Sequence, residues 1–251
     1  MLNYKAIGYG PKKVVVLHDW LGDHRNYLGI ERYLSQDHFT WIFADLRGYG
    51  LSRGIAGQYT LSEAVADVWA LIEKLNLDNV ALVSHSMTGM VALRMALEFG
   101  DRVAKVVAAA PVTDAGLELD HASLTFFTKA VTDQTTCGEV IANVTGGRYG
   151  EEWRALKTRL AFEASTEEAR MGYLRNMLLK ERFTEDIRGL STPVLAICGR
   201  HDAPAFVEEA IRAKTHEVLP NISYETIEES GHYMMEEAPV RFASLIQAFI
   251  S

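Results

Sequence analysis

The chain has 251 residues, of which 48% are hydrophobic and 23% are charged, a composition that supports a folded core and argues against disorder. Its 25 Lys and Arg residues against 33 Asp and Glu residues give a net charge of −8, and such a surface repels nucleic-acid phosphates and anionic lipid. The length favours one large α/β domain, or one domain with an insertion, over two ordinary domains.

The sequence carries no signal for export or membrane insertion. The N-terminus lacks a basic region followed by a long apolar stretch, and no run approaches the roughly 18 apolar residues of a spanning helix. The two cysteines, Cys137 and Cys198, lie far apart and form no CxxC motif, so neither a disulfide scaffold nor a cysteine zinc site is expected. We therefore expect a cytoplasmic globular protein.

Short continuous apolar runs predict strands that are buried on both faces of a parallel sheet. Such strands are expected at Val14–Leu17, Phe39–Ala44, Val80–Val83, Val103–Ala109 and Val194–Ile197, and a further strand is expected at Ile222–Ile227. Apolar residues at helical spacing lie between them, as in the stripe formed by Val65, Val68, Ile72 and Leu75. This alternation predicts an α/β fold with a mostly parallel sheet that helices cover on both faces.

The strand pattern is interrupted from about Val112 to about Leu190. Here the spacing predicts helices over His121–Val131, Thr135–Val144, Glu151–Ala164 and Glu167–Lys180. An all-helical insertion between two parallel strands is typical of a lid over the carboxyl edge of the sheet, where open α/β sheets bind ligands. We therefore expect a core of residues 1–111 and 191–251 and a helical cap of residues 112–190.

The segment Val80–Gly89 contains a strand that runs directly into a helix, with Ser86 between them. A nucleophile at such a junction sits on a very tight turn, whose strained backbone angles hold its side chain clear of the sheet. The residues two before and two after it must be small, and Ser84 and Thr88 stand there where glycine is usual. We predict that Ser86 is a nucleophile; the alternative is a serine that only caps the helix.

A serine nucleophile needs a base to take its proton and a third group to orient that base. His232 lies between the last predicted strand and the final helix, on the same sheet edge as Ser86, and is the expected base. Asp202 directly follows a predicted strand and is the expected orienting acid. Two alternatives stay open, because Asp202 also suits the cap of a helix that opens at Pro204, and the chain order also permits Asp114 as the acid.

Acyl transfer passes through a tetrahedral oxyanion, which backbone N–H groups stabilise, and loss of one donor costs about 3–4 kcal/mol. Met87, the residue after the predicted nucleophile, supplies one such N–H. The loop Leu17–Gly22, directly after the first predicted strand, supplies the other. Trp20 and Met87 are therefore the expected oxyanion donors.

These segments, in this order, resemble the α/β-hydrolase superfamily along essentially the whole chain. The resemblance includes Asp45–Ser52, a segment whose part in the family is mainly structural. Within the superfamily, the sequence is similar to small carboxylesterases, enol-lactonases, carbon–carbon-bond hydrolases and cofactor-free haloperoxidases. The resemblance implies an α/β-hydrolase fold with a helical cap and no cofactor. It also implies a catalytic triad of Ser86, His232 and Asp202.

A further departure from the family pattern lies in the first loop. Asp19 stands where glycine usually follows the histidine, and aspartate tolerates positive φ less well than glycine. His85 is interpreted as structural, because neighbours at a nucleophile turn point in different directions. The pairs His18–Asp19 and His201–Asp202 lack the spacing of metal ligands, so no metal site is expected.

The residues that select a substrate carry no motif in this sequence. Aromatic side chains of the cap are the candidates for the pocket wall, namely Phe126, Phe127, Trp153 and Tyr173. The glutamates near His232 are interpreted as a solvated acidic rim, namely Glu228, Glu229, Glu236 and Glu237.

The sequence thus predicts a serine hydrolase that acts on a small-molecule ester, lactone or thioester through an acyl-enzyme. Two alternatives stay open: a receptor that keeps the triad, and a lyase or cofactor-free oxygenase that uses the same pocket without hydrolysis. A small-molecule substrate is the expected partner, with no nucleic acid and no membrane. The sequence does not define an oligomeric state.

Overall fold

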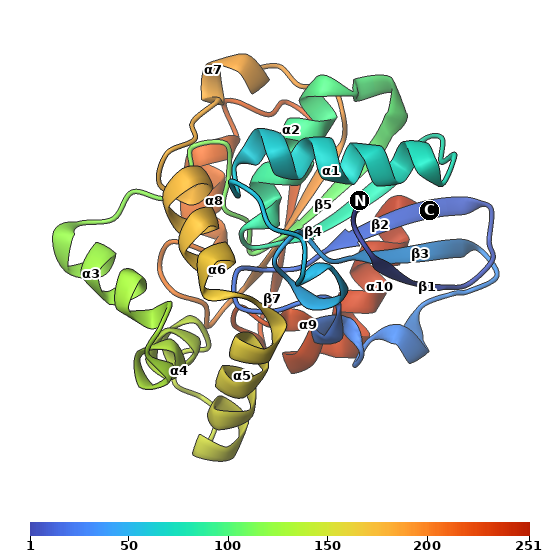
Figure 1. The fold of residues 1–251 in the computed structure, drawn as a ribbon. Helices are drawn as coiled ribbons and strands as arrows, with labels where there is room; N and C mark the ends of the chain where they lie inside the picture. Colours follow the sequence, from blue (N-terminus) through green and yellow to red (C-terminus); the bar gives the residue numbers. More distant parts are fainter.

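A seven-stranded sheet forms the centre of the computed structural model, which describes residues 1–251 (Figure 1). Its strands are β1 (Tyr4–Ile7), β2 (Lys12–Leu17), β3 (Phe39–Ala44), β4 (Val80–His85), β5 (Val103–Ala109), β6 (Val194–Gly199) and β7 (Ile222–Ile227). They lie in the order β1-β3-β2-β4-β5-β6-β7, and every neighbouring pair is parallel except β1 and β3. The predicted mostly parallel sheet is confirmed.

The strand β1 is the one strand of the sheet that the sequence does not predict. It pairs antiparallel with β3 at the edge of the sheet, and none of its side chains is fully buried. An edge strand has no need of a continuous apolar run, because only part of its surface meets the core. By contrast, all six residues of β4 are buried, which explains why its run is so clear.

Helices cover both faces of the sheet. Outside the chain between β5 and β6 they are α1 (Leu61–Lys74), α2 (Thr88–Glu98), α8 (Glu208–Thr215), α9 (Met234–Glu237) and α10 (Pro239–Ile250). The helices α1 and α2 lie on one side of the sheet and α10 lies on the other (Figure 1). Val65, Val68 and Ile72 of the predicted stripe are buried on α1, so this stripe is the face that packs on the core.

The chain between β5 and β6 contains helices and no strand, as predicted. They are α3 (His121–Ala130), α4 (Gln134–Val144), α5 (Glu151–Ala164), α6 (Glu167–Tyr173) and α7 (Thr184–Ile187). The prediction of one helix over Glu167–Lys180 is wrong, because α6 ends at Tyr173 and passes into a π-helical turn at Leu174–Leu178. The helices α3, α4 and α5 pack one against the next and project from one end of the sheet (Figure 1).

One hydrophobic cluster joins the sheet to this helical segment. It includes Val15 and Leu82 of the strands together with Ile141 of α4 and Leu174 of the π-helical turn. The helical segment therefore packs on the same core as the sheet. None of the helices combines the length and the apolar character needed to cross a membrane.

Candidate active site

Ser86 lies at the junction of β4 and α2, where the chain turns sharply. Its φ is 52°, in the left-handed region that residues other than glycine rarely adopt. Backbone hydrogen bonds hold the turn, because the Ser86 N–H donates to the Ala109 carbonyl and the Ser86 carbonyl accepts from the Val112 N–H, both at 2.9 Å. The strained turn predicted at Ser86 is therefore present.

Small side chains around this turn let β4 and α2 approach closely. Ser84 and Thr88 are both buried, and the Thr88 hydroxyl accepts a hydrogen bond from the His85 N–H at 3.0 Å. The threonine hydroxyl thus pairs with the last backbone N–H of the strand and helps to hold the turn. A Cβ at Gly89 would lie 2.7 Å from the Cβ of Pro111, so this position has room only for glycine.

His232 and Asp202 form a buried pair beyond the ends of β7 and β6. His232 Nδ1 lies 2.7 Å from Asp202 Oδ2, and the other oxygen of Asp202 accepts the Ala203 N–H, also at 2.7 Å. Burial works to lower the pKa of His232, but the charge and hydrogen bond of Asp202, helped by Asp19 and Glu237, raise this pKa above its ordinary value. The imidazole is therefore oriented and made more basic.

Asp114, the alternative acid, lies apart from His232. Its Oδ2 accepts a hydrogen bond at 2.6 Å from the threonine that opens α7, and burial raises its pKa. The helix expected to open at Pro204 begins instead at Glu208, so Asp202 does not cap it. The geometry pairs Asp202, and not Asp114, with His232.

Two of the glutamates near His232 are not part of a solvated rim. Glu228 and Glu229 are exposed, as predicted. The prediction is wrong for Glu236, whose carboxylate lies 2.6 Å from a buried lysine ammonium, and for Glu237, whose side chain is 1% exposed. Glu228 and Glu229 lie in the exposed turn after β7, whereas Glu236 and Glu237 belong to α9, which is why four similar residues have different surroundings.

Glu237 holds the loop that carries His232. Its carboxylate accepts the N–H groups of Gly231 at 2.7 Å and Tyr233 at 2.8 Å, the two neighbours of His232. The Arg148 guanidinium, 3.0 Å from Glu237 Oε2, balances the buried charge. Glu237 therefore fixes the backbone on both sides of the imidazole, a role with no local sequence signal.

We expect Glu237→Ala to lower the free energy of unfolding by about 2 kcal/mol or more, because each buried N–H left unpaired costs about 1–3 kcal/mol. Chemical denaturation measures this difference. Glu229→Ala, at an exposed neighbouring position, is the matched control and should change stability by less than about 0.5 kcal/mol. Equal stability of the two variants would contradict the role given to Glu237.

The backbone N–H groups of Trp20 and Met87 donate no hydrogen bond within the protein. His18 fixes the direction of the first. The Leu46 N–H donates to His18 Nε2 at 3.0 Å, so in the neutral ring Nδ1 carries the proton and donates to the Asp19 carbonyl at 2.7 Å. Because the N–H and C=O of a trans peptide point in opposite directions, the Trp20 N–H points away from His18. The sequence places His18 in the predicted oxyanion loop but gives no sign that its ring fixes the Trp20 N–H.

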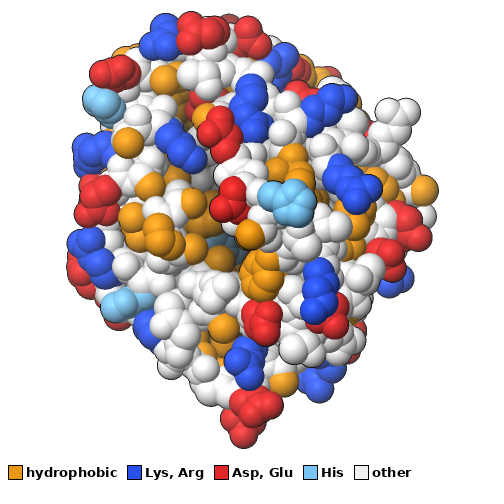
Figure 2. Space-filling model, turned by 90° about the vertical axis from the view of Figure 1, so that its left-hand side faces the viewer, with side chains coloured by type: hydrophobic (Ala, Val, Ile, Leu, Met, Phe, Trp, Pro, Cys, Tyr) orange, Lys and Arg blue, Asp and Glu red, His pale blue; other side chains and the backbone are white.

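Ser86 and His232 line one cavity of about 780 Å³. Hydrophobic side chains gather around a hollow on the face shown in Figure 2, the side of the molecule that carries α3, α6 and α8. Phe126 and Phe127 line the cavity. Its wall is mostly apolar, and the other polar residues in it are Asp19, Glu118, Ser123, Asn143 and Lys214.

Trp153 and Tyr173 do not line the cavity, in contrast to the prediction. Tyr173 is fully buried between Tyr49 and Tyr59, with ring centroids 5.8 Å and 5.4 Å away, and Trp153 packs against Tyr149 at 4.7 Å. Both aromatic side chains therefore pack against other rings of the protein instead of facing the cavity. The π-helical turn after α6 supplies leucines to the cavity wall instead.

The cysteines take no part in the site. Both are buried and free, and burial raises the pKa of Cys137 and of Cys198 to about 12, so the thiols stay protonated at neutral pH. No group of three or more His, Cys, Asp or Glu side chains is arranged to hold a metal ion.

Known proteins share this fold over nearly the whole chain. A crystal structure of a bromoperoxidase from Bacillus anthracis matches with a TM-score of 0.88 and 26% identity, over 99% of this chain and 95% of that one. The enol-lactonase from Burkholderia xenovorans matches with a TM-score of 0.85 and 20% identity, over 99% and 96% of the two chains. A putative 2-succinyl-6-hydroxy-2,4-cyclohexadiene-1-carboxylate synthase from Bacillus subtilis is 24% identical over 100% of this chain and 95% of the relative. The family model for the alpha/beta hydrolase fold matches residues 12–239, and the chain belongs to this family.

Proposed function

We propose that this α/β-hydrolase family member is a serine hydrolase that cleaves a small-molecule carboxylic ester, lactone or thioester. One observation carries the proposal: the strained Ser86 and His232, which pairs with Asp202, line one cavity together with Trp20, and the backbone N–H groups of Trp20 and of Met87, the residue after Ser86, are free. The mostly apolar wall suits an uncharged organic substrate of small or medium size.

The proposed reaction begins when Ser86 Oγ attacks the substrate carbonyl and gives its proton to His232 Nε2. Nδ1 of this ring donates to Asp202, so in the neutral imidazole Nε2 is the basic nitrogen. The Trp20 and Met87 N–H groups stabilise the oxyanion. His232 then returns the proton to the leaving alcohol or thiol, and the acyl group stays on Ser86 until water, activated by His232, releases the acid.

Product analysis on a substrate panel tests the proposal. The panel holds p-nitrophenyl esters of increasing acyl length, an aliphatic lactone and a thioester. We expect acid and alcohol, or acid and thiol, in equal amounts from at least one class. The synthase named among the relatives gives the non-hydrolytic alternative, and consumption of a substrate without release of an acid would favour it.

The pH dependence of kcat/KM should follow the protonation of His232. The ring must be neutral to accept the Ser86 proton, and Asp202 outweighs burial and raises the His232 pKa above 6.5. Activity is therefore expected to rise with pH through an acidic limb centred above the ordinary histidine value. Initial rates from about pH 5 to about pH 9 bracket that limb. A limb centred below the ordinary histidine pKa would contradict the assignment of His232.

A further inference from the structure

We propose that Asp19 is a positioning residue of the active site: it fixes the turn that carries the Trp20 N–H and places a second carboxylate beside the His232 imidazole. The helix α5 holds this carboxylate in place through a buried lysine. The inference rests on the proposed function, because it assigns a role to a departure from the family pattern within the same site.

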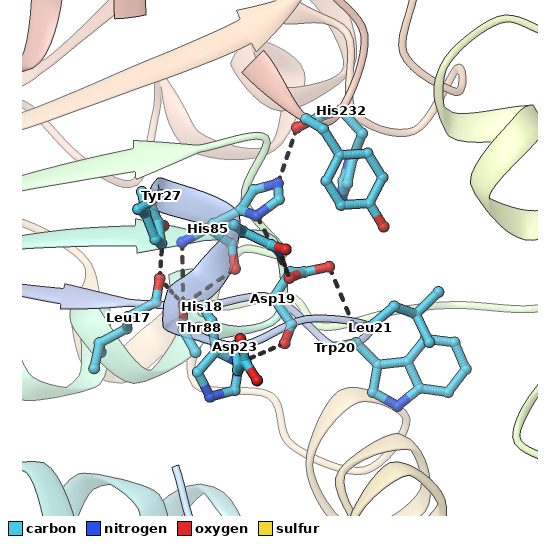
Figure 3. A network of polar contacts seen from close by, with 12 residues as sticks. Leu17, His18, Asp19, Trp20, Leu21, Asp23, Tyr27, His85, Thr88 and His232 are labelled. Carbon is cyan, nitrogen blue, oxygen red and sulfur yellow. Dashed lines mark hydrogen bonds and ion pairs between the residues drawn. The ribbon is translucent and has the colours of Figure 1, made fainter. Parts of the chain in front are cut away.

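Asp19 lies in the cavity wall between His85 and the Trp20–Leu21 turn (Figure 3). Its side chain is 3% exposed. Oδ2 accepts the Leu21 N–H at 3.2 Å, and Oδ1 accepts a hydrogen bond from Asn26 Nδ2 at 2.7 Å. The Asp19 side chain thus fixes the backbone after Trp20 through the Leu21 N–H. The hydrogen bond from His18 to the Asp19 carbonyl fixes the backbone before Trp20. The free Trp20 N–H is held from both sides.

Lys157 connects this carboxylate to α5. Its ammonium donates to Asn26 Oδ1 at 2.9 Å and to Glu236 Oε1 at 2.6 Å, and lies 4.3 Å from the ring centroid of Tyr233. Lys157 is 1% exposed, and a buried ammonium costs several kcal/mol unless it is paired. One side chain of the helical segment therefore joins the loop of Asp19 to the helix that follows His232.

Several titratable groups share a charge interaction with Asp19, and they are His18, Tyr27, Tyr49, His85, Cys137, Lys157, His232, Tyr233 and Glu236. Burial works to raise the pKa of Asp19, but attraction to His85 in its protonated form and to Lys157 outweighs it and leaves this pKa below its ordinary value. Burial also lowers the pKa of His85 to about 3, so His85 is neutral at neutral pH. The positive charge near Asp19 at this pH is therefore the Lys157 ammonium. Asp19 is therefore ionised, with its charge partly balanced near the oxyanion.

His85 lies between Asp19 and His232 but does not join the two side chains by hydrogen bonds. Its Nε2 donates to the His232 carbonyl at 2.9 Å, and its Nδ1 lies 3.8 Å from Asp19 Oδ1 with no hydrogen-bond partner. The influence of Asp19 on His232 is therefore electrostatic, through a buried region of low dielectric constant. The carboxylates that favour the His232 imidazolium are Asp202, Asp19 and Glu237.

The test compares Asp19→Asn with Asp23→Asn. Asparagine at position 19 keeps the size but removes the charge, and its single amide oxygen cannot accept from both the Leu21 N–H and Asn26 Nδ2, so the turn loses one of its two ties. Asp23 is a matched control, since it is a buried carboxylate of the same loop that pairs with Arg25, 2.9 Å away. We expect Asp19→Asn to lower kcat about tenfold or more, by weakening one oxyanion donor, with KM nearly unchanged. We also expect the acidic limb of kcat/KM to move to lower pH in Asp19→Asn only.

A second readout keeps this proposal separate from the proposed function. The His232 titration followed by NMR should move to lower pH in Asp19→Asn and stay in place in Asp23→Asn, with or without turnover. An unmoved titration in Asp19→Asn, or an equal shift in both variants, would overturn the proposal. If Asp19→Asn does not fold, Asp19→Gly takes its place with the same expected shift. A wild-type protein that hydrolyses nothing refutes the proposed function alone, because the titration still decides the role of Asp19.

Discussion

Ser86→Ala is expected to lower kcat for ester hydrolysis on the order of 10⁴-fold or more, because loss of the nucleophile removes the acyl-enzyme route altogether. Steady-state rates on the best substrate of the panel measure the loss. Alanine fits the space of serine, and the turn at φ 52° is held by backbone bonds, so the fold should persist.

Ser84→Ala is the matched control for this variant. Its hydroxyl is buried on β4 two residues before Ser86 and donates to the Val107 carbonyl at 3.1 Å. We expect Ser84→Ala to keep its activity within a few-fold of wild type. Activity retained in Ser86→Ala, with both variants folded, would show that Ser86 is not the nucleophile.

Asp202→Asn is expected to lower kcat by about 10⁴-fold, since an amide at this position favours the wrong tautomer of His232 and removes the charge that stabilises the imidazolium. The same rate assay measures it. Asp114→Asn is the matched control, because Asp114 is a buried carboxylate that contacts α7 and not His232. A large loss in Asp114→Asn together with a small one in Asp202→Asn would reverse the assignment of the acid.

The sequence predicts the central strands well because each is buried on both faces and must be apolar throughout. The edge strand β1 escapes this rule, since none of its side chains is fully buried. Ser86, His232 and Asp202 can be predicted to lie at one edge of the sheet for a related reason. Each follows a recognisable strand, and the carboxyl ends of parallel strands meet at one edge of the sheet.

The surroundings of the site are not predictable in this way. Lys157 and Asn26 stand 131 residues apart in the sequence, and no local pattern indicates that they meet. Glu237 looks like the exposed Glu228 and Glu229 until its two backbone partners are known. Aromatic residues at helical spacing look alike whether they face a cavity, as Phe127 does, or the packed interior, as Tyr173 does.

The helical segment between β5 and β6 lines part of the cavity and also contacts residues of the proposed site. The carbonyl of Val144, at the end of α4, accepts the His232 N–H at 2.9 Å. The Trp20 indole donates to the Arg170 carbonyl of α6 at 2.9 Å. The segment therefore helps to position both the proposed base and one proposed oxyanion donor, and changes in it should affect kcat as well as the choice of substrate.

Labelling with a fluorophosphonate probe, followed by intact mass and peptide mapping, tests the central claim most directly. Such a probe reacts with an activated serine and not with an ordinary one. Folded wild-type protein should gain a single adduct on Ser86, and Ser86→Ala and heat-denatured wild type should gain none. Folded wild type without an adduct, or with its adduct on another residue, would contradict the assignment of Ser86 as an activated nucleophile.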